Sequence, residues 1–459
     1  MRLAERDADC LQFAARTAKL VRACGLRKLI ADVFGQKFGC GVDPFELAQL
    51  IEIAIVQWGE GGLQRLVGAA DIDDDTVRIK SVGKEGCIDN EGCPMFLLTA
   101  AAYWLAFGLL GFTLAGRSAA LGTLPPLLAL LPPAFIFVGV IWRDVLFAVI
   151  WLLAIALTFA VTDRPSRLRV PIQIIAFALC CLGVLLRPNS IIAAPLLAIY
   201  IVWPLQMRWK RTAFLFVPAI AGFFALVQLV YYGVLGATRQ HPLQSIMIFD
   251  LGGISHFTKE NQFPVTWNER DTALLLNGCY RPTEWDLYWR LEPCEFVMRK
   301  IEKEEKLFGT PAIPKAWASA IARHPIAYLE HRASFMWNFL GGSNLTMWVA
   351  NIEKPDETVF PDRPAFAVLM VVHDVLKPTI FFRVGFWLLA CLVMFALAWR
   401  RRDTPAGALT IAACGSASLY VLTFFAVGVA SDFRYGYWAV LASIAGLSAL
   451  LSPAKPRSG

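Results

Sequence analysis

The chain has 459 residues, of which 57% are hydrophobic and 17% are charged, and its formal net charge is +7. Soluble proteins carry about 25% charged and about 45–50% apolar residues, so this composition excludes a soluble enzyme and a soluble nucleic-acid-binding domain. The apolar residues gather in uncharged runs of about 16 to 27 residues, near the length of about 20 that a membrane-spanning helix needs. Basic residues in such a protein report first on topology, so the positive charge does not indicate nucleic acid.

Uncharged apolar runs follow one another along the chain and are the candidate membrane spans. They cover 95–116, 118–142, 145–162, 170–186, 188–207, 212–238, 384–399, 405–431 and 436–454. A single-anchor protein would have one such run. The sequence predicts an all-α polytopic membrane protein with about nine transmembrane helices and a large extracytoplasmic domain of mixed structure.

These runs divide the chain into four expected parts. They are an N-terminal polar segment (1–95), a six-helix transmembrane block (96–238), an extracytoplasmic domain with an interfacial helix (239–379), and a three-helix block with a short cytoplasmic tail (380–459). The third part is placed outside the membrane because residues 239–366 are too polar to cross it.

The basic residues fall mainly in alternate loops, which predicts the orientation. The opposite set of short loops contains only Arg143, Arg187 and Arg434. By the positive-inside rule the richly basic set is cytoplasmic, which places the polar domain in the periplasm of a cell inner membrane. The basic set consists of Arg117, Arg164, Arg167, Arg169, Arg208, Lys210, Arg211, Arg400, Arg401, Arg402, Lys455 and Arg457.

The first 95 residues do not fit this arrangement. They contain neither an uncharged run long enough to span a membrane nor the apolar stretch of a signal peptide. Their basic start favours the cytoplasm, whereas the order of the spans places the residues before Phe96 outside. Three interpretations follow: the segment is exported without a signal, the stretch 47–58 is partly inserted, or a native first helix is missing from this reading frame. We favour the third.

The cysteines and histidines differ in their distribution. Cys279 and Cys294 lie in the polar domain, where an oxidising compartment favours a disulfide between them. Cys87 and Cys93 form a weaker candidate pair. The five histidines are scattered over the polar domain and its end, so the sequence predicts no metal site built from them.

Aromatic residues are frequent in the polar domain. The stretch AWASAIARHPIAYLEHRASFMWNFL (316–340) repeats apolar residues at helical spacing. It predicts an amphipathic helix that lies on the membrane or in the domain core. Its aromatic side chains could alternatively form a wall that stacks on a sugar or a lipid headgroup.

Ionisable residues stand at three corners between spans on the predicted outer side. WRDVL contains Arg143 and Asp144, RPN contains Arg187, and SDFRYGY contains Asp432 and Arg434. Ionisable groups at the membrane are candidates for function because they need water or a partner there. Each arginine alone could extend to lipid headgroups. Three on one side, two with an acid within two residues, indicate a site that binds a phosphate and holds a carboxylate nearby.

Several short motifs resemble a known family. VDPFELAQLIEIAI (42–55) resembles the acidic start of the first outer loop in GT-C fold glycosyltransferases similar to glycosyltransferase family 39, which includes protein O-mannosyltransferases and lipid A aminoarabinose transferases. NEGCPMFLLTAAAYWLAFG (90–108), AGRSAALGTL (115–124) and WRDVLFAVIWLLAIAL (142–157) are similar to the next span, the following cytoplasmic turn and the second outer acid. The family's first span precedes the first outer acid, and residues 1–40 do not supply it.

The resemblance implies an inverting glycosyltransferase that moves a sugar from a polyprenyl-phosphate donor to a hydroxyl of an envelope glycan, a lipid or a protein. It implies Asp43 as the base that accepts the proton of the acceptor hydroxyl, with Glu46 as its neighbour one helical turn on. Asp144 matches the second acid, which would orient the acceptor or the donor sugar.

Charge on the leaving phosphate needs cationic partners. Arg143, Arg187 and Arg434 are the expected donor-phosphate ligands. The acidic group Asp71, Asp73, Asp74 and Asp75 could hold a divalent cation, although a solvated acidic loop is the simpler interpretation. The sequence indicates no further cofactor and no nucleic-acid partner.

Two other functions stay open at this point. A polytopic transporter or a flippase for lipid-linked glycans would also have many spans and polar residues at the membrane. The ionisable residues at span ends and the long polar domain argue against it. An inactive, truncated glycosyltransferase paralogue would explain the first 95 residues.

Overall fold

The computed structural model describes residues 93–116, 118–238, 240–290, 292–342 and 371–452. Two compact units compose the chain: residues 1–102, 138–141 and 228–238 form one, and residues 103–137, 142–227 and 239–459 form the other. Asp43, Glu46, the Asp71–Asp75 group and Cys87 lie outside the described residues.

The described residues are mainly helical, and five helices are long and apolar enough to cross a membrane. They are α4 (Cys93–Ala115), α7 (Arg143–Val161), α8 (Ser166–Leu186), α10 (Trp209–Gln228) with its π-helical continuation η2 (Leu229–Val234), and α19 (Pro405–Val427). The all-α membrane class predicted from the sequence agrees with these helices, whereas nine spans stay a prediction.

Prolines shorten two of the expected spans. The run 118–142 forms α5 (Ala119–Leu128), with Pro125 and Pro126 inside it, and then α6 (Pro132–Phe135). Pro125 and Pro126 lie within α5, and the chain leaves the helical conformation at Leu131, because Pro132 at the start of α6 disfavours a helical residue before it. The run 188–207 likewise forms η1 (Pro188–Ile192) and α9 (Ala194–Val202).

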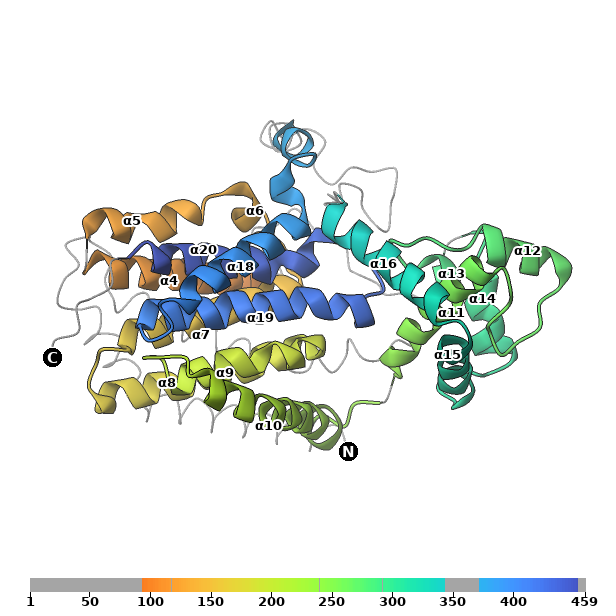
Figure 1. Cartoon of the computed structure of the whole chain (residues 1–459), viewed down its shortest axis with the longest axis horizontal. Coiled ribbons are helices and arrows are strands. Elements are labelled where there is room, and N and C mark those ends of the chain that lie inside the picture. Colours follow the sequence, from red (N-terminus) through yellow and green to blue (C-terminus); the bar gives the residue numbers. More distant parts are fainter. Residues whose placement is uncertain (1–92, 117, 239, 291, 343–370, 453–459) are drawn as a thin grey trace, which may run out of the picture. The chain divides into compact units, whose positions relative to one another are not determined.

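Within the second unit, apolar helices pack around α7 and α19 (Figure 1). α7 pairs with α8, and α19 packs against α9, α18 (Val384–Trp399) and α20 (Tyr437–Leu450), while α20 also contacts α7. α7 is buried along most of its length, as expected for a helix that is hydrophobic on every side. α10 instead exposes apolar side chains such as Phe214 (79% exposed), a surface that suits lipid rather than water.

Small residues allow the close packing of α19. A side chain at Gly415 would meet Leu196 of α9 and Phe395 of α18, and one at Gly446 of α20 would meet Cys414. Membrane helices use glycine, alanine and serine in this way because dispersion contacts between close backbones stabilise their association.

The loops that carry most of the basic residues lie at one end of the helices, and the opposite set of loops lies at the other end. At one end, the backbone N–H of Met207 donates to the carbonyl of Arg402 over 2.9 Å, and Arg401 donates to the carbonyl of Leu450 over 2.9 Å. These contacts bring the 207–211 loop, the 400–402 loop and the end of α20 together. Asp144, Arg187 and Arg434 lie at the other ends of α7, α8 and α20.

Residues 242–341 form what we call the α11–α16 segment. It contains α11 (Pro242–Thr258), α12 (Glu269–Asn277), α13 (Leu287–Arg290), α14 (Phe296–Met298), η3 (Arg299–Glu304), α15 (Ala312–Arg323) and α16 (Pro325–Gly341). α11 packs against α12, α15 and α16, and α16 also contacts α18 and α19. The segment is expected from the sequence to have mixed structure; its described residues form helices joined by loops, and their strand-like pairing is limited to an isolated bridge between Glu284 and Ala430.

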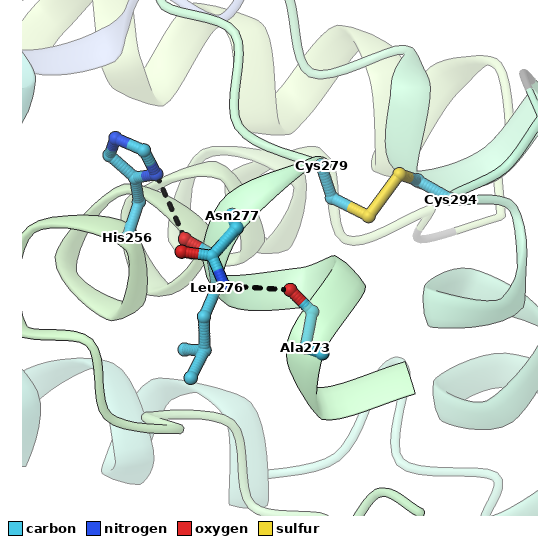
Figure 2. The surroundings of a disulfide bond; sticks show 6 residues. All are labelled: His256, Ala273, Leu276, Asn277, Cys279 and Cys294. Atoms are coloured by element: carbon cyan, nitrogen blue, oxygen red, sulfur yellow. Dashed lines mark hydrogen bonds between the residues drawn. A yellow bond between two sulfur atoms is a disulfide. The ribbon is translucent and has the colours of Figure 1, made fainter. Parts of the chain in front are cut away.

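A disulfide joins Cys279 and Cys294 in this segment, the pair expected from the sequence (Figure 2). It closes the loop between α12 and α14. Next to it, Nδ1 of His256 donates to the carbonyl of Leu276 over 3.0 Å, which attaches the end of α12 to α11. The bridge and this hydrogen bond together fix the 279–294 loop on α11.

Candidate functional site

The carboxylate of Asp144 lies between two arginines that come from other parts of the chain. Nε of Arg187 is 2.8 Å from Oδ1 of Asp144, and Nε of Arg434 is 3.9 Å from Oδ2. The Asp144 side chain is 9% exposed, so its charge needs these partners. Three of the residues selected from the sequence therefore form one cluster.

The pairing of α7 with α8 brings Asp144 and Arg187 together. Asp144 lies in the first turn of α7, and Arg187 follows the last residue of the antiparallel α8. The indole of Trp151 lies over Gly183, where a side chain would overlap it, and donates to the carbonyl of Cys180 over 3.1 Å. The positive end of the α7 dipole also stabilises a carboxylate in its first turn.

The second acid–arginine pair comes from the corner between α19 and α20. Asp432 caps η5 (Phe433–Gly436): its Oδ1 accepts a hydrogen bond from the backbone N–H of Arg434 over 2.9 Å. Its Oδ2 lies 3.3 Å from Nε of Arg434. Burial raises the pKa of the Asp432 carboxyl above its ordinary value, although Arg434 beside it acts in the opposite direction.

Aromatic rings contact the two guanidinium groups through cation–π interactions. The guanidinium carbons of Arg187 and Arg434 lie 4.8 Å and 5.0 Å from the centre of the Tyr435 ring. Arg434 also lies 4.5 Å from the Trp142 ring, and Nε of Arg187 donates to the hydroxyl of Tyr420 over 3.3 Å. Cation–π contacts orient a guanidinium without using its hydrogen-bond donors.

The guanidinium groups of Arg187 and Arg434 are therefore held in place while some of their N–H groups stay available as hydrogen-bond donors. Nε of Arg187 pairs with Asp144 and donates to Tyr420. Nε of Arg434 lies at ion-pair distance from Asp432 but makes no hydrogen bond within the described part of the chain, and one terminal nitrogen of Arg434 donates to Tyr435. The side chains are 19% and 28% exposed. Among the described residues, the terminal nitrogens of Arg187 and one of Arg434 have no hydrogen-bond acceptor, and such groups match the oxygens of a phosphate.

Not every sequence-selected residue belongs to the cluster. Arg143 is exposed, whereas the adjacent Asp144 is buried. The structure therefore places Arg143 outside the group, whereas Asp43 and Glu46 lie outside the described residues. Among the described residues, no group of three or more histidine, cysteine, aspartate or glutamate side chains is arranged to hold a metal ion.

Tyr420 is the member of the cluster that the sequence analysis missed. It lies in the apolar run 405–431, two turns before the end of α19, where a tyrosine is ordinarily a packing residue. Its hydroxyl is the signal that could have drawn attention, since a buried phenol in a membrane helix needs a partner. Asp432 was noted at its corner but not selected as a site residue.

Comparison with protein-family models, with curated proteins and with solved structures gave no match. The geometry of the cluster and the chemistry of its residues therefore provide the indications of function.

Proposed function

We propose that the protein is an inner-membrane glycosyltransferase of the GT-C type that moves a sugar from a polyprenyl-phosphate donor to a hydroxyl acceptor. The reaction would take place at the periplasmic face, where the positive-inside rule puts Asp144, Arg187 and Arg434. The observation that carries the proposal is the convergence of these three residues, with Asp432, at one end of the helix bundle.

The arginines suit the leaving group of this reaction. The acceptor oxygen attacks the anomeric carbon, the bond from that carbon to the phosphate oxygen breaks with inversion, and the electron pair stays on the lipid phosphate. Arg187 and Arg434 would stabilise this charge, because guanidinium groups bind phosphate oxygens in pairs.

The acceptor proton needs a carboxylate. Both oxygens of Asp144 face arginines, so Asp144 is better suited to hold the two guanidinium groups than to accept a proton. The resemblance in the first outer loop assigns the base to Asp43.

Binding of undecaprenyl phosphate to the purified protein in nanodiscs tests the phosphate site. Arg187→Ala and Arg434→Ala should each weaken binding by about 10-fold or more, equivalent to about 1.4 kcal/mol or more. Arg143→Ala is the matched control, because this exposed arginine lies one residue from Asp144 and outside the cluster. Equal effects of all three substitutions would contradict the proposed site.

Transfer of radiolabelled sugar from a panel of polyprenyl-phosphate sugars to membrane acceptors tests the reaction. The release of polyprenyl phosphate should accompany transfer and should require Arg187 and Arg434. Uptake of a solute by proteoliposomes without transfer would instead support the transporter alternative.

A further inference from the structure

A buried ionic cluster lies in the α11–α16 segment, away from the proposed phosphate site. Asp250 of α11 is fully buried, and its Oδ1 lies 2.7 Å from Nε of Arg332 and 3.1 Å from Nε2 of His331. Its Oδ2 accepts a hydrogen bond from the Trp317 indole over 2.7 Å. A carboxylate without water requires such partners, so this cluster fixes α11, α15 and α16 relative to one another.

The protonation of this cluster follows from its geometry. Burial lowers the pKa of His331, although Asp250 opposes this effect, so the imidazole is neutral at pH 7. A proton on Nε2 suits the Asp250 carboxylate, and Nδ1 then accepts from the Tyr280 hydroxyl, 3.0 Å away. Arg332 is therefore the permanent cation that balances Asp250.

Arg332 also reaches the corner between α19 and α20. Its Nη1 donates to the carbonyl of Gly428 over 2.7 Å, and both residues are buried. Gly428 follows α19 directly, and a side chain there would overlap the ring of Phe335, one turn beyond Arg332 on α16. α16 thus holds the end of α19 through one hydrogen bond and one close contact.

The next residues of that corner pair with the loop closed by the disulfide. The N–H of Trp285 donates to the carbonyl of Val429 over 2.9 Å, and the N–H of Ser431 donates to the carbonyl of Thr283 over 2.7 Å. Asp432 follows immediately. The α11–α16 segment therefore contacts the corner from Gly428 to Ser431, the residue before Asp432.

A column of aromatic rings makes a second connection between α16 and the site. Phe339 of α16 stacks on Phe424 of α19 at 4.9 Å, and Phe424 stacks on Tyr435 at 5.4 Å. Tyr435 is the ring beside which both site arginines lie.

We propose that the α11–α16 segment holds the Asp432–Arg434 corner in its phosphate-binding geometry, and that Arg332 is the positioning residue that transmits this constraint through the Gly428 carbonyl. Arg332 does not touch the proposed phosphate site. The kinetic part of its test rests on the proposed glycosyltransferase function, whereas the structural part does not.

Hydrogen exchange of the full-length protein tests the constraint without any substrate. Arg332→Lys keeps a positive charge near Asp250 but removes the planar group that reaches both Asp250 and Gly428. It should increase exchange in the 428–436 region and leave the α7 and α8 regions unchanged. Arg323→Lys is the matched control, because Arg323 hydrogen-bonds Gln262 within the α11–α16 segment. Unchanged exchange at 428–436 in a folded Arg332→Lys protein would overturn the proposal.

Kinetics distinguish positioning from general stability. If Arg332 positions the corner, Arg332→Lys should raise KM for the donor by about 2- to 30-fold with little change in kcat. At saturating concentration, the bound donor would hold the Asp432–Arg434 corner in its phosphate-binding geometry. A loss of folded protein would lower kcat without changing KM, and that pattern would overturn the proposal. Binding of undecaprenyl phosphate should weaken in parallel with the rise in KM. If no sugar is transferred, the proposed function fails, while exchange and phosphate binding still decide this inference.

A milder variant guards against misfolding of Arg332→Lys. Ser431→Ala removes only the hydrogen bond from Oγ to the Thr283 carbonyl, 3.1 Å long, on a half-buried residue. It should increase exchange at 428–436 in the same direction and to a smaller extent. Unchanged exchange in this variant would contradict the proposed pairing with the α11–α16 segment.

Discussion

Nε of Arg187 lies 2.8 Å from Oδ1 of Asp144 and joins the C-terminal end of α8 to the first turn of α7. Water screens the attraction between the two charges only in part, since the side chains of Arg187 and Asp144 are 19% and 9% exposed. Removing one partner of such a pair leaves the other charge without compensation in a poorly hydrated place. The pair is therefore expected to contribute to stability as well as to the site.

Asp144→Asn should destabilise the protein by about 1–3 kcal/mol, because the amide keeps the shape but not the charge that Arg187 and Arg434 face. Thermal unfolding in detergent measures the change. Arg143→Gln alters the neighbouring, exposed residue and should leave the unfolding temperature nearly unchanged. Equal shifts for the two variants would show that Asp144 makes no net ion-pair contribution.

Topology reporters test the orientation on which the outer-face site depends. Fusions after Arg211 and after Arg402 should report the cytoplasm, because both loops belong to the basic set. A fusion near Lys303, in η3 of the α11–α16 segment, should report the periplasm. The reverse pattern would place Asp144, Arg187 and Arg434 on the cytoplasmic side and remove the proposed reaction.

The disulfide should be measurable both chemically and thermodynamically. Alkylation of the native protein without reductant should leave Cys279 and Cys294 unlabelled, and reduction should expose both. The bond closes a loop with a sequence separation of 15, so replacing both residues by serine should cost about 3 kcal/mol through loop-closure entropy. Cys181→Ser, which changes a half-buried free cysteine of α8, is the control. Free labelling of both thiols in an oxidised preparation would contradict the bond.

The sequence anticipated the apolar helices and the convergence of Asp144, Arg187 and Arg434, whereas nine spans and the function of the cluster stay predictions. Charge-free runs identify apolar helices because hydrocarbon tolerates few charges, but they do not register proline. The run 118–142 is continuous by composition, but it breaks at Leu131, which Pro132 at the start of α6 keeps out of the helical conformation. The order of the loops predicted that Asp144, Arg187 and Arg434 lie on the same side of the helices, because alternate loops of a membrane protein share one side.

Other features depend on contacts that a single sequence does not display. Arg143 and Asp144 are adjacent in the first turn of α7, where successive side chains point about 100° apart, and only packing determines which one is buried. The partnership of Asp250 with Arg332 likewise joins distant helices. The local sequence indicates this partnership only through Asp250, an acid within the apolar stretch IMIFDLGGIS. In the same stretch, a side chain at Gly253 would overlap the His331 ring.

Acid should destabilise the α11–α16 segment through His331. Its folded pKa is lowered mainly by burial, so the unfolded chain binds a proton near its ordinary pKa of about 6.5 before the folded chain does. Stability should be independent of this group above about pH 6.5 and should fall as pH decreases below that value, by at most about 1.4 kcal/mol per pH unit. The pKa of His256 is also lowered, by burial and by Lys259, so it adds to the same slope.

Thermal unfolding from pH 7.5 to 5 measures this slope. His331→Gln should reduce it because the titrating group is gone, whatever the variant's stability at pH 7.5. A slope that His331→Gln leaves unchanged would contradict a buried, neutral His331.

The last prediction separates the role of the acids from that of the arginines in the proposed transfer. If Asp43 is the base, Asp43→Asn keeps the shape but accepts no proton, and turnover should fall by about 10²- to 10⁴-fold. Binding of undecaprenyl phosphate should change little, because the carboxylate acts only when the acceptor hydroxyl attacks. Arg187→Ala and Arg434→Ala should instead weaken donor binding together with turnover, because they remove ligands present in both ground and transition states. Glu46→Gln is the control and should retain most activity. Full transfer by Asp43→Asn, combined with loss of transfer in Asp144→Asn or Asp432→Asn, would instead make the carboxylate of Asp144 or Asp432 the base that accepts the proton.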